Sequence, residues 1–182
     1  MRTLILLALA TPAFADSTLR FTSPPFFLPP VKHVVITKAG EPGPGQAKHS
    51  AIAAFDTVNA DVSLPDQGAF DLWFVPKDGL PVKAVSNLKP ANTRELKLNS
   101  CLAVINYKGD DQPRGKLIVT SYDDPGPEGK RHRPIQSASD IRADMAVPPG
   151  DYAIWIAPDS GTRARKIVDK VRAFAGKTTS AE

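Results

Sequence analysis

One ten-residue pattern occurs twice in this chain, and it limits the folds available to the chain more than any other feature. The first copy is residues 70–79, FDLWFVPKDG, and the second is residues 152–161, YAIWIAPDSG. In each copy an aromatic residue precedes a Trp by three positions, a Pro follows that Trp by three, and a Gly follows it by six. Alternating apolar residues that end in Pro and Gly are typical of a strand and a turn. We therefore predict an internally duplicated strand–turn–strand unit.

The remainder of the chain has the same short β pattern. Runs of β-branched and aromatic residues, separated by Gly, Pro, Asn and Asp, occupy residues 69–75, 82–85, 93–98, 101–107, 116–122 and 152–157. Eighteen prolines in 182 residues disfavour long helices, because Pro lacks the backbone N–H that a helix needs. Turn signals about ten residues apart are typical of a sandwich or a barrel. We predict an all-β protein, an antiparallel β-sandwich, with a single domain from residue 16 to residue 182.

Two segments fit more than one structure. Apolar residues at positions 164, 167, 168, 171 and 175 have helical spacing. The duplication instead predicts a strand there, because the matching segment of the first copy contains Asn87 and Pro90. We follow the duplication and predict a strand. Residues 51–62 fit either a short helix or a kinked strand.

The N-terminus has the composition of a secretory signal. Arg2 precedes a short apolar run, and Ala13-Phe14-Ala15 has the small-x-small pattern of a cleavage site. The run is too short to span a bilayer, which takes about 20 residues. We predict a signal peptide over residues 1–15, a periplasmic or secreted location in a bacterium, and no membrane insertion. The proline-rich residues 16–30 are expected to form an extended N-terminal segment.

One part of the second copy resembles a known family of domains. In residues 147–156, VPPGDYAIWI, a Pro/Gly turn precedes Gly-x-Tyr and a strand, and residues 174–179, FAGKTT, form a turn with a Thr-rich end. This is similar to the closing element of transthyretin-like and carboxypeptidase-regulatory-like β-sandwich domains. The resemblance covers about thirty residues and implies a small antiparallel sandwich that serves as an accessory or interaction module. It implies no functional residues.

Candidate binding residues fall into two groups, one aromatic and one basic. Strand alternation places Trp73 and Trp155 on the face opposite the bulky apolar residues of their strands, so that they form either an exposed aromatic surface or a covered part of the core. Basic residues cluster near positions 130–133 and 163–172 and either contact an anionic polymer or form a solvated face. The predicted binding residues are Trp73, Trp155, Lys130, Arg131, Arg133, Arg165 and Lys166. A net charge of +4 without a continuous basic stripe predicts no nucleic-acid binding.

No local signature of catalysis or of a metal site is present. The three histidines are far apart, and the chain has no nucleophile elbow, phosphate loop or Cys-x-x-Cys motif. Acidic pairs at 110–111 and 123–124, with Glu128, fit a Ca²⁺ site less well than solvated turns. Cys101 is the only cysteine, and its apolar neighbours predict a buried, inert thiol. We predict no catalytic residues, no metal and no cofactor.

These observations predict a function of a general kind. The preferred hypothesis is an exported accessory or binding module that recognises a protein or an anionic or neutral polysaccharide of the cell envelope, without catalysis. One alternative is an extracytoplasmic hydrolase whose site lies in the loops of residues 110–134, using His132 or the loop carboxylates. A second alternative is a structural subunit that forms a homo-oligomer.

Overall fold

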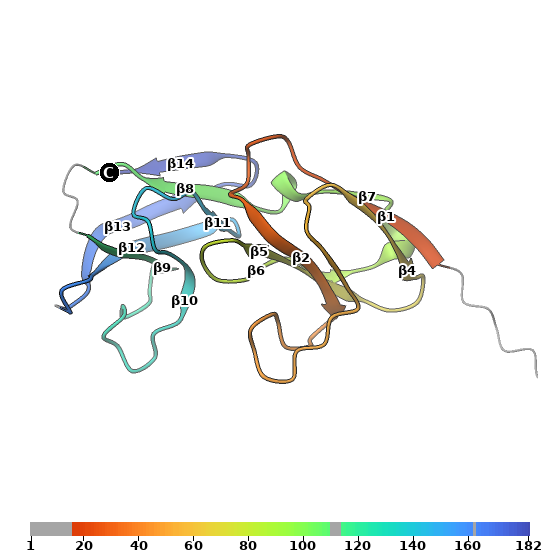
Figure 1. Cartoon of the computed structure of the whole chain (residues 1–182), viewed down its shortest axis with the longest axis horizontal. Helices are drawn as coiled ribbons and strands as arrows, with labels where there is room; N and C mark the ends of the chain where they lie inside the picture. The colour runs from red at the N-terminus through yellow and green to blue at the C-terminus, as the bar shows by residue number, and fades with distance from the viewer. Residues whose placement is uncertain (1–15, 110–113, 162) are drawn as a thin grey trace, which may run out of the picture.

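The computed structural model describes residues 16–109, 114–161 and 163–182, and in them the chain is sandwich-like and all-β, with four sheets (Figure 1). The predicted signal peptide, residues 1–15, lies outside the described residues. The first half contains β1 (Asp16–Thr22), β2 (Val31–Lys38), β3 (Ala53–Phe55), β4 (Ala60–Pro65), β5 (Phe70–Pro76), β6 (Val82–Leu88) and β7 (Glu95–Lys97). The second half contains β8 (Ala103–Tyr107), β9 (Gly115–Ser121), β10 (Pro134–Ala138), β11 (Met145–Val147), β12 (Gly150–Pro158), β13 (Arg165–Ala173) and β14 (Thr178–Ala181).

Both halves have the same topology, so the duplication is larger than the strand–turn–strand unit that the sequence predicts. In the first half, one sheet has the order β4-β1-β7 and the other has the order β3-β2-β5-β6. In the second half the orders are β11-β8-β14 and β10-β9-β12-β13, which match strand for strand. The first strand of each half pairs antiparallel with the fourth strand and parallel with the seventh. Each half is therefore a seven-stranded sandwich of a three-stranded and a four-stranded sheet.

The two copies also share their irregularities. The β5–β6 pairing shifts register on both sides of Leu72, and the β12–β13 pairing shifts on both sides of Ile154. As a result Trp73 lies opposite Lys83 and Trp155 lies opposite Lys166. A bulge twists a strand and changes the direction of its side chains. The shared bulges therefore place equivalent residues of the two copies in equivalent positions.

Two buried clusters fill the spaces between the sheets, one in each half. Leu19, Phe21, Ile36 and Leu72 belong to the first cluster, and residues including Ile105, Leu117, Ile154 and Ile156 belong to the second. All eight side chains have no exposed surface. Burial of such side chains stabilises the fold by about 1.5–3 kcal/mol each. The cores thus lie on the inner faces of the strands, as the alternation predicts.

The halves contact one another through a third cluster and a buried glutamine. Phe74 and Val82 of the first half pack against Leu102 and Ala146 of the second. Gln136 on β10 is 1% exposed, and its side chain reaches the turn between β5 and β6. Its Nε2 donates to the Leu80 carbonyl at 3.0 Å, and its Oε1 accepts from the Leu80 N–H at 2.5 Å. The relative position of the two sandwiches is therefore fixed by apolar packing and by specific hydrogen bonds.

Several local predictions are tested by these strands. Residues 165–173 form strand β13, which confirms the expectation taken from the duplication and rules out the helix. Residues 51–62 contain two short strands, β3 and the start of β4. Within the segment predicted to be extended, residues 16–22 form β1 in the middle of a sheet, and residues 25–27 form a turn. Apolar residues at alternate positions 19 and 21 place that strand in the core. The single domain over residues 16–182 stays a prediction.

Candidate binding surface

The loop between β9 and β10, residues 122–133, folds over the outer face of its own sheet. Gly126 lies against the indole of Trp155, so closely that a Cβ there would approach the ring atoms within 2.3 Å. The Trp155 Nε1 donates to Thr120 Oγ1 at 3.1 Å. Further along the loop, Glu128 Oε1 accepts from the backbone N–H of Ala164, just before β13, at 3.2 Å. The loop therefore runs across β12 and reaches the beginning of β13.

A buried carboxylate holds this loop in shape. Asp124 accepts hydrogen bonds from the backbone N–H of Gly126 at 2.8 Å and of Arg133 at 2.9 Å. His132 Nδ1 lies 3.1 Å from the same carboxylate, whose side chain is 7% exposed. Burial opposes ionisation of Asp124, but the N–H donors and His132 together hold the pKa of its carboxyl below the usual range. Asp124 is therefore an ionised anchor that joins both ends of the loop.

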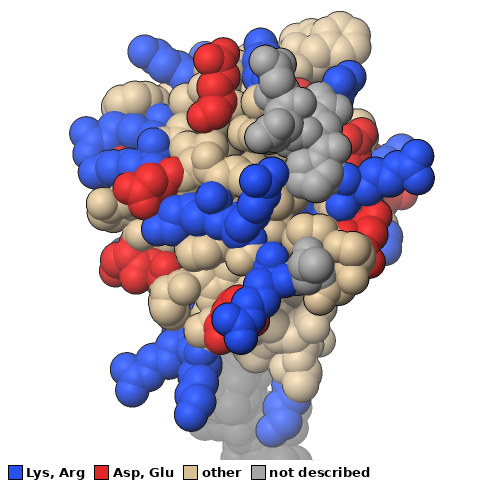
Figure 2. Space-filling view, turned by 90° about the vertical axis from the view of Figure 1, so that its left-hand side faces the viewer, with Lys and Arg blue, Asp and Glu red and all other residues tan. Residues whose placement is uncertain are grey.

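Basic side chains project around the anchored loop. Lys130, Arg131, Arg133 and Arg165 are exposed, and none of them has a carboxylate within ion-pair distance among the described residues. Lys166 lies 5.1 Å from the centre of the Trp155 ring. We call the five cations Lys130, Arg131, Arg133, Arg165 and Lys166 the basic corner. Figure 2 shows the end of the molecule that carries the β12–β13 hairpin, where Lys and Arg side chains are interspersed with acidic ones.

Several acidic side chains of the β9–β10 loop and of its sheet have partners within the chain. Asp151 accepts from Arg172 at 2.7 Å and lies 3.2 Å from Lys170, and these cations hold the pKa of its carboxyl far below the usual range. Lys170 also lies 4.8 Å from the centre of the Tyr122 ring. Asp124 and Glu128 are bonded to backbone N–H groups, as described above. Lys166 pairs with Asp169 at 3.0 Å, and the exposed Asp123 lies on the same loop as Lys130, Arg131 and Arg133, so acidic side chains offset part of the positive charge of the basic corner.

Of the seven predicted binding residues, Lys130, Arg131 and Arg133 lie on the β9–β10 loop, and Trp155 and Lys166 contact one another beside Gly126 of that loop. Arg165 precedes Lys166 on β13 and lies opposite Ile156 of β12. Trp73 occupies the position equivalent to Trp155 in the first half. Both indoles are partly buried, and each already contacts a loop glycine and a Lys ammonium group. Figure 1 shows that the β2–β3 and β9–β10 loops project on the same side of the molecule. Stacking of a ligand on either indole stays a prediction, and it would require part of the loop to move.

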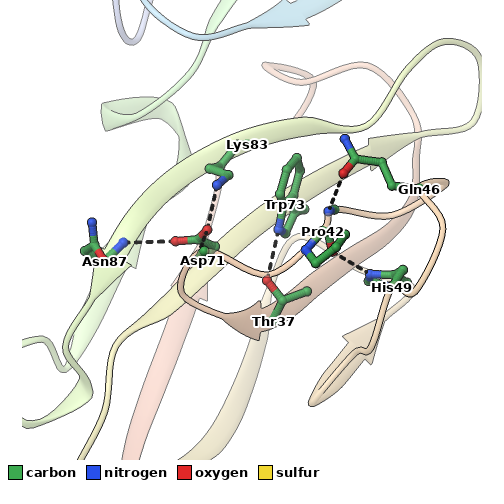
Figure 3. Close-up of polar contacts among 10 residues, drawn as sticks. Thr37, Pro42, Gln46, His49, Asp71, Trp73, Lys83 and Asn87 are labelled. Atoms are coloured by element: carbon green, nitrogen blue, oxygen red, sulfur yellow. Dashed lines mark hydrogen bonds and ion pairs between the residues drawn. The ribbon is translucent and has the colours of Figure 1, made fainter.

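Figure 3 shows the equivalent arrangement around Trp73. The Trp73 Nε1 donates to Thr37 Oγ1 at 3.2 Å, and Gly43 lies against the indole. Lys83 lies 4.8 Å from the ring centre and 2.6 Å from the carboxylate of Asp71. The Asp71 side chain is only 2% exposed. It also accepts from the backbone N–H of Gly40 and of Asn87.

The sequence analysis did not detect that the loop over each Trp is also duplicated, although the sequence contains a signal of it. Residues 42–49, PGPGQAKH, and residues 125–132, PGPEGKRH, share Pro-Gly-Pro and a basic residue before His. Both stretches contain the same reverse turns, because residue 46 donates to residue 43 and residue 129 donates to residue 126. The loop repeat is 83 residues apart, whereas the two Trp residues are 82 apart. Comparison of turn residues as well as strand residues would have found it.

Other predicted sites have a clear position in the structure. Across the described ranges, no three His, Cys, Asp or Glu side chains are grouped so as to hold a metal ion. Asp110 and Asp111 of the weighed Ca²⁺ site lie outside the described residues. Cys101 is partly exposed, with Sγ 3.7 Å from the Lys97 carbonyl, so its predicted burial is wrong. It precedes β8 instead of belonging to the strand, which explains its exposure.

The hydrolase alternative has one element of a catalytic site. His132 and Asp124 pair as a base and its orienting carboxylate would. No hydrogen bond joins His132 to a Ser, Thr or Cys nucleophile in the part of the chain that the structure describes. A cavity of about 470 Å³ lies elsewhere, where the β5–β6 turn meets the second half, and Asp78, Lys116 and Ser139 are among its lining residues. The hydrolase hypothesis therefore stays a prediction, and no nucleophile beside His132 is identified among the described residues.

Comparisons with known proteins do not extend this picture. Searches against family models, curated proteins and solved structures found no match. In the part of the chain that is described, no helix has the length and apolar content needed to cross a bilayer. The functional interpretation therefore depends on the geometry of the binding surface.

Proposed function

We propose that this protein is an exported binding module without catalytic activity, and that its basic corner binds an anionic polysaccharide of the cell envelope. The main observation behind this proposal is that four cations are exposed and have no carboxylate partner among the described residues: Lys130, Arg131, Arg133 and Arg165. The predicted signal peptide supports the extracytoplasmic location.

The shape of the surface favours a polymer over a small molecule. The cations lie on or beside a loop that crosses the outside of a sheet, and the cavity of about 470 Å³ is lined by other residues. A small ligand is normally enclosed in a concave site, whereas an extended polyanion can contact several separate cations at once. Tyr122, which is 44% exposed beside Lys170, adds an aromatic face on which a sugar ring can pack.

A protein partner is the second candidate, and the surface favours it less. Protein interfaces have an apolar centre that is rich in buried aromatic anchors. The basic corner is polar, and Tyr122 is its exposed large apolar neighbour. The resemblance to transthyretin-like interaction modules fits either partner and does not decide between them.

Binding to defined polysaccharides tests the proposal. The purified protein is titrated with polygalacturonate, with dextran sulfate and with neutral dextran, and the dissociation constants are measured at low and at moderate ionic strength. We expect binding to at least one of the two anionic polymers, weakened by salt, and no binding to neutral dextran, because the interaction is between exposed charges. Equal affinity for a DNA duplex would contradict polysaccharide recognition.

Matched charge variants locate the site. The triple variant K130A/R131A/R133A is compared with K32A/K89A/K97A, which removes three exposed cations from the first half. Both variants lose the same net charge. We expect about a tenfold or larger loss of affinity in the first variant and little change in the second. Equal losses would show that only net charge matters and would overturn the assignment of the site.

A further inference from the structure

The two copies contain the same Trp–Lys pair. Trp73 and Lys83 lie opposite one another on β5 and β6, and Trp155 and Lys166 do so on β12 and β13. The ammonium groups lie 4.8 and 5.1 Å from their ring centres. The Lys side chains are equally exposed, at 34% each. A difference between the two lysines must therefore come from their other neighbours.

In the first copy, a buried carboxylate neutralises the lysine. The Lys83 Nζ lies 2.6 Å from Asp71, whose side chain is 2% exposed. The backbone N–H groups of Gly40 and Asn87 donate to the same carboxylate, at 3.2 and 3.1 Å (Figure 3). Removing Lys83 from this carboxylate would leave a buried charge with fewer partners, which is costly. A ligand anion would have to compete with Asp71 for this ammonium group.

In the second copy, the equivalent position holds Ala153. Asp71 lies opposite Thr37 on β2, and Ala153 lies opposite Thr120 on β9, where each Thr accepts the indole N–H of its own copy. Ala153 is fully buried and cannot neutralise a lysine. Lys166 instead pairs with Asp169 at 3.0 Å, whose side chain is 73% exposed. Such an exposed pair is worth about 0–1 kcal/mol, so that an incoming anion can replace it.

We infer that the two copies have diverged, so that the first serves as a scaffold and the second binds the ligand. Lys166 contacts an anionic group of the polysaccharide, and Lys83 does not. The residue at the Asp71 position determines this difference, because a carboxylate there occupies the lysine and an alanine leaves it available. This inference rests on the proposed function, and it names the cation beside Trp155 as a ligand contact.

Two single variants test the divergence directly. K166A and K83A each remove one ammonium group from a Trp–Lys pair of equal exposure, and so serve as controls for one another. With the anionic polymer that the wild-type protein binds, K166A should lose about tenfold in affinity, which is the scale of one charged hydrogen bond. K83A should bind within about twofold of the wild-type protein, but with a lower melting temperature, because Asp71 loses a partner.

A third variant transfers the first-copy arrangement to the second copy. A153D places a carboxylate where it can reach Lys166, and it should weaken polymer binding as much as K166A does. Adding K166A to A153D should then cause little further loss, because the same contact is already removed. Affinities are measured below the melting temperature of each variant. If A153D does not fold, the K166A and K83A pair decides.

The outcomes separate this inference from the proposed function. No binding of the wild-type protein to either anionic polymer overturns the proposed function and the inference together. Binding by the wild-type protein with equal losses in K166A and K83A, or with no loss in K166A, overturns the inference alone. Unchanged binding by a folded A153D variant also contradicts it.

Discussion

Gln136 offers a test of how the two sandwiches are held together. Its side chain is 1% exposed and exchanges two hydrogen bonds with the backbone of Leu80 in the other half. Its Nε2 also donates to the Ala146 carbonyl at 3.3 Å, and its Oε1 accepts from the Ser137 N–H at 2.8 Å. Gly79 packs against the same amide, where a Cβ would lie 2.5 Å from Oε1. The Gln136 side-chain amide thus pairs with the backbone N–H and carbonyl of Leu80 as a neighbouring strand would.

The expected cost of Gln136→Ala follows from these contacts. The two bonds to Leu80 contribute about 0.5–1.5 kcal/mol each, and leaving partly buried backbone groups unpaired adds about 1–3 kcal/mol. The sum is about 2–6 kcal/mol in the free energy of unfolding. For a chain of this size each kcal/mol corresponds to about 2–4 °C, so the melting temperature should fall by at least about 4 °C.

Thermal unfolding followed by circular dichroism measures this effect. Gln46→Ala is the matched control, because Gln46 is exposed and accepts a single bond from Gly43 at 3.3 Å. We expect the control to change the melting temperature by less than about 2 °C. A Gln136→Ala variant that melts within about 2 °C of the wild-type protein would refute the role of the glutamine in joining the halves.

Three further predictions concern the loops. Gly126→Ala should lower the melting temperature strongly, because the added Cβ would meet the Trp155 ring. Gly161 is also at positive φ but has free space around it, so Gly161→Ala should cost only about 1 kcal/mol of stability. Equal shifts of the two variants in differential scanning calorimetry would contradict this prediction. The folded pKa of Asp124 lies below its unfolded value, so its stabilisation is complete above the unfolded pKa and is lost as pH falls through the folded pKa. Asp124→Asn should therefore lose less stability than the wild-type protein between about pH 6 and pH 3 in urea titrations, and an unchanged pH dependence would rule out this anchor. Phe26 is fully exposed at φ 60°, so Phe26→Asn should raise stability by about 0.5–1 kcal/mol in the same titrations, and a decrease would show that the side chain has a stabilising contact.

The sequence was sufficient to predict the fold class and the strand at residues 165–173. Alternating apolar residues determine which face of a strand is buried, and Pro and Gly mark where the strands end. The full extent of the duplication could not be predicted in the same way. Backbone hydrogen bonds hold equivalent strands such as β1 and β8 in equivalent sheets, while their side chains need only be apolar and of suitable size.

The sequence predicted which residues belong to the candidate site, but not the loop and the buried carboxylates that position them. The basic residues were visible as clusters along the chain, and exposed charges need no tertiary contact to be recognised. The structural roles of Asp71 and Asp124 were not predicted, because their burial depends on loops that cross a sheet face or close on themselves. Alternation assigns Asp71 to the outer face of β5, and only the folded β2–β3 loop shows that this face is covered.

The order of strands in each sandwich has a consequence for how the protein folds. The opening strand of each half lies between the fourth and the last strand of that half, so that Phe21 pairs with Leu96 and Tyr107 pairs with Ala181. Such pairings join residues more than seventy positions apart, and loop closure over that distance makes folding slow. During synthesis, β8 remains without its parallel neighbour until β14 has left the ribosome. Deletion of β14, Thr178–Ala181, should therefore slow or block the folding of the second sandwich, whereas the first sandwich should still fold.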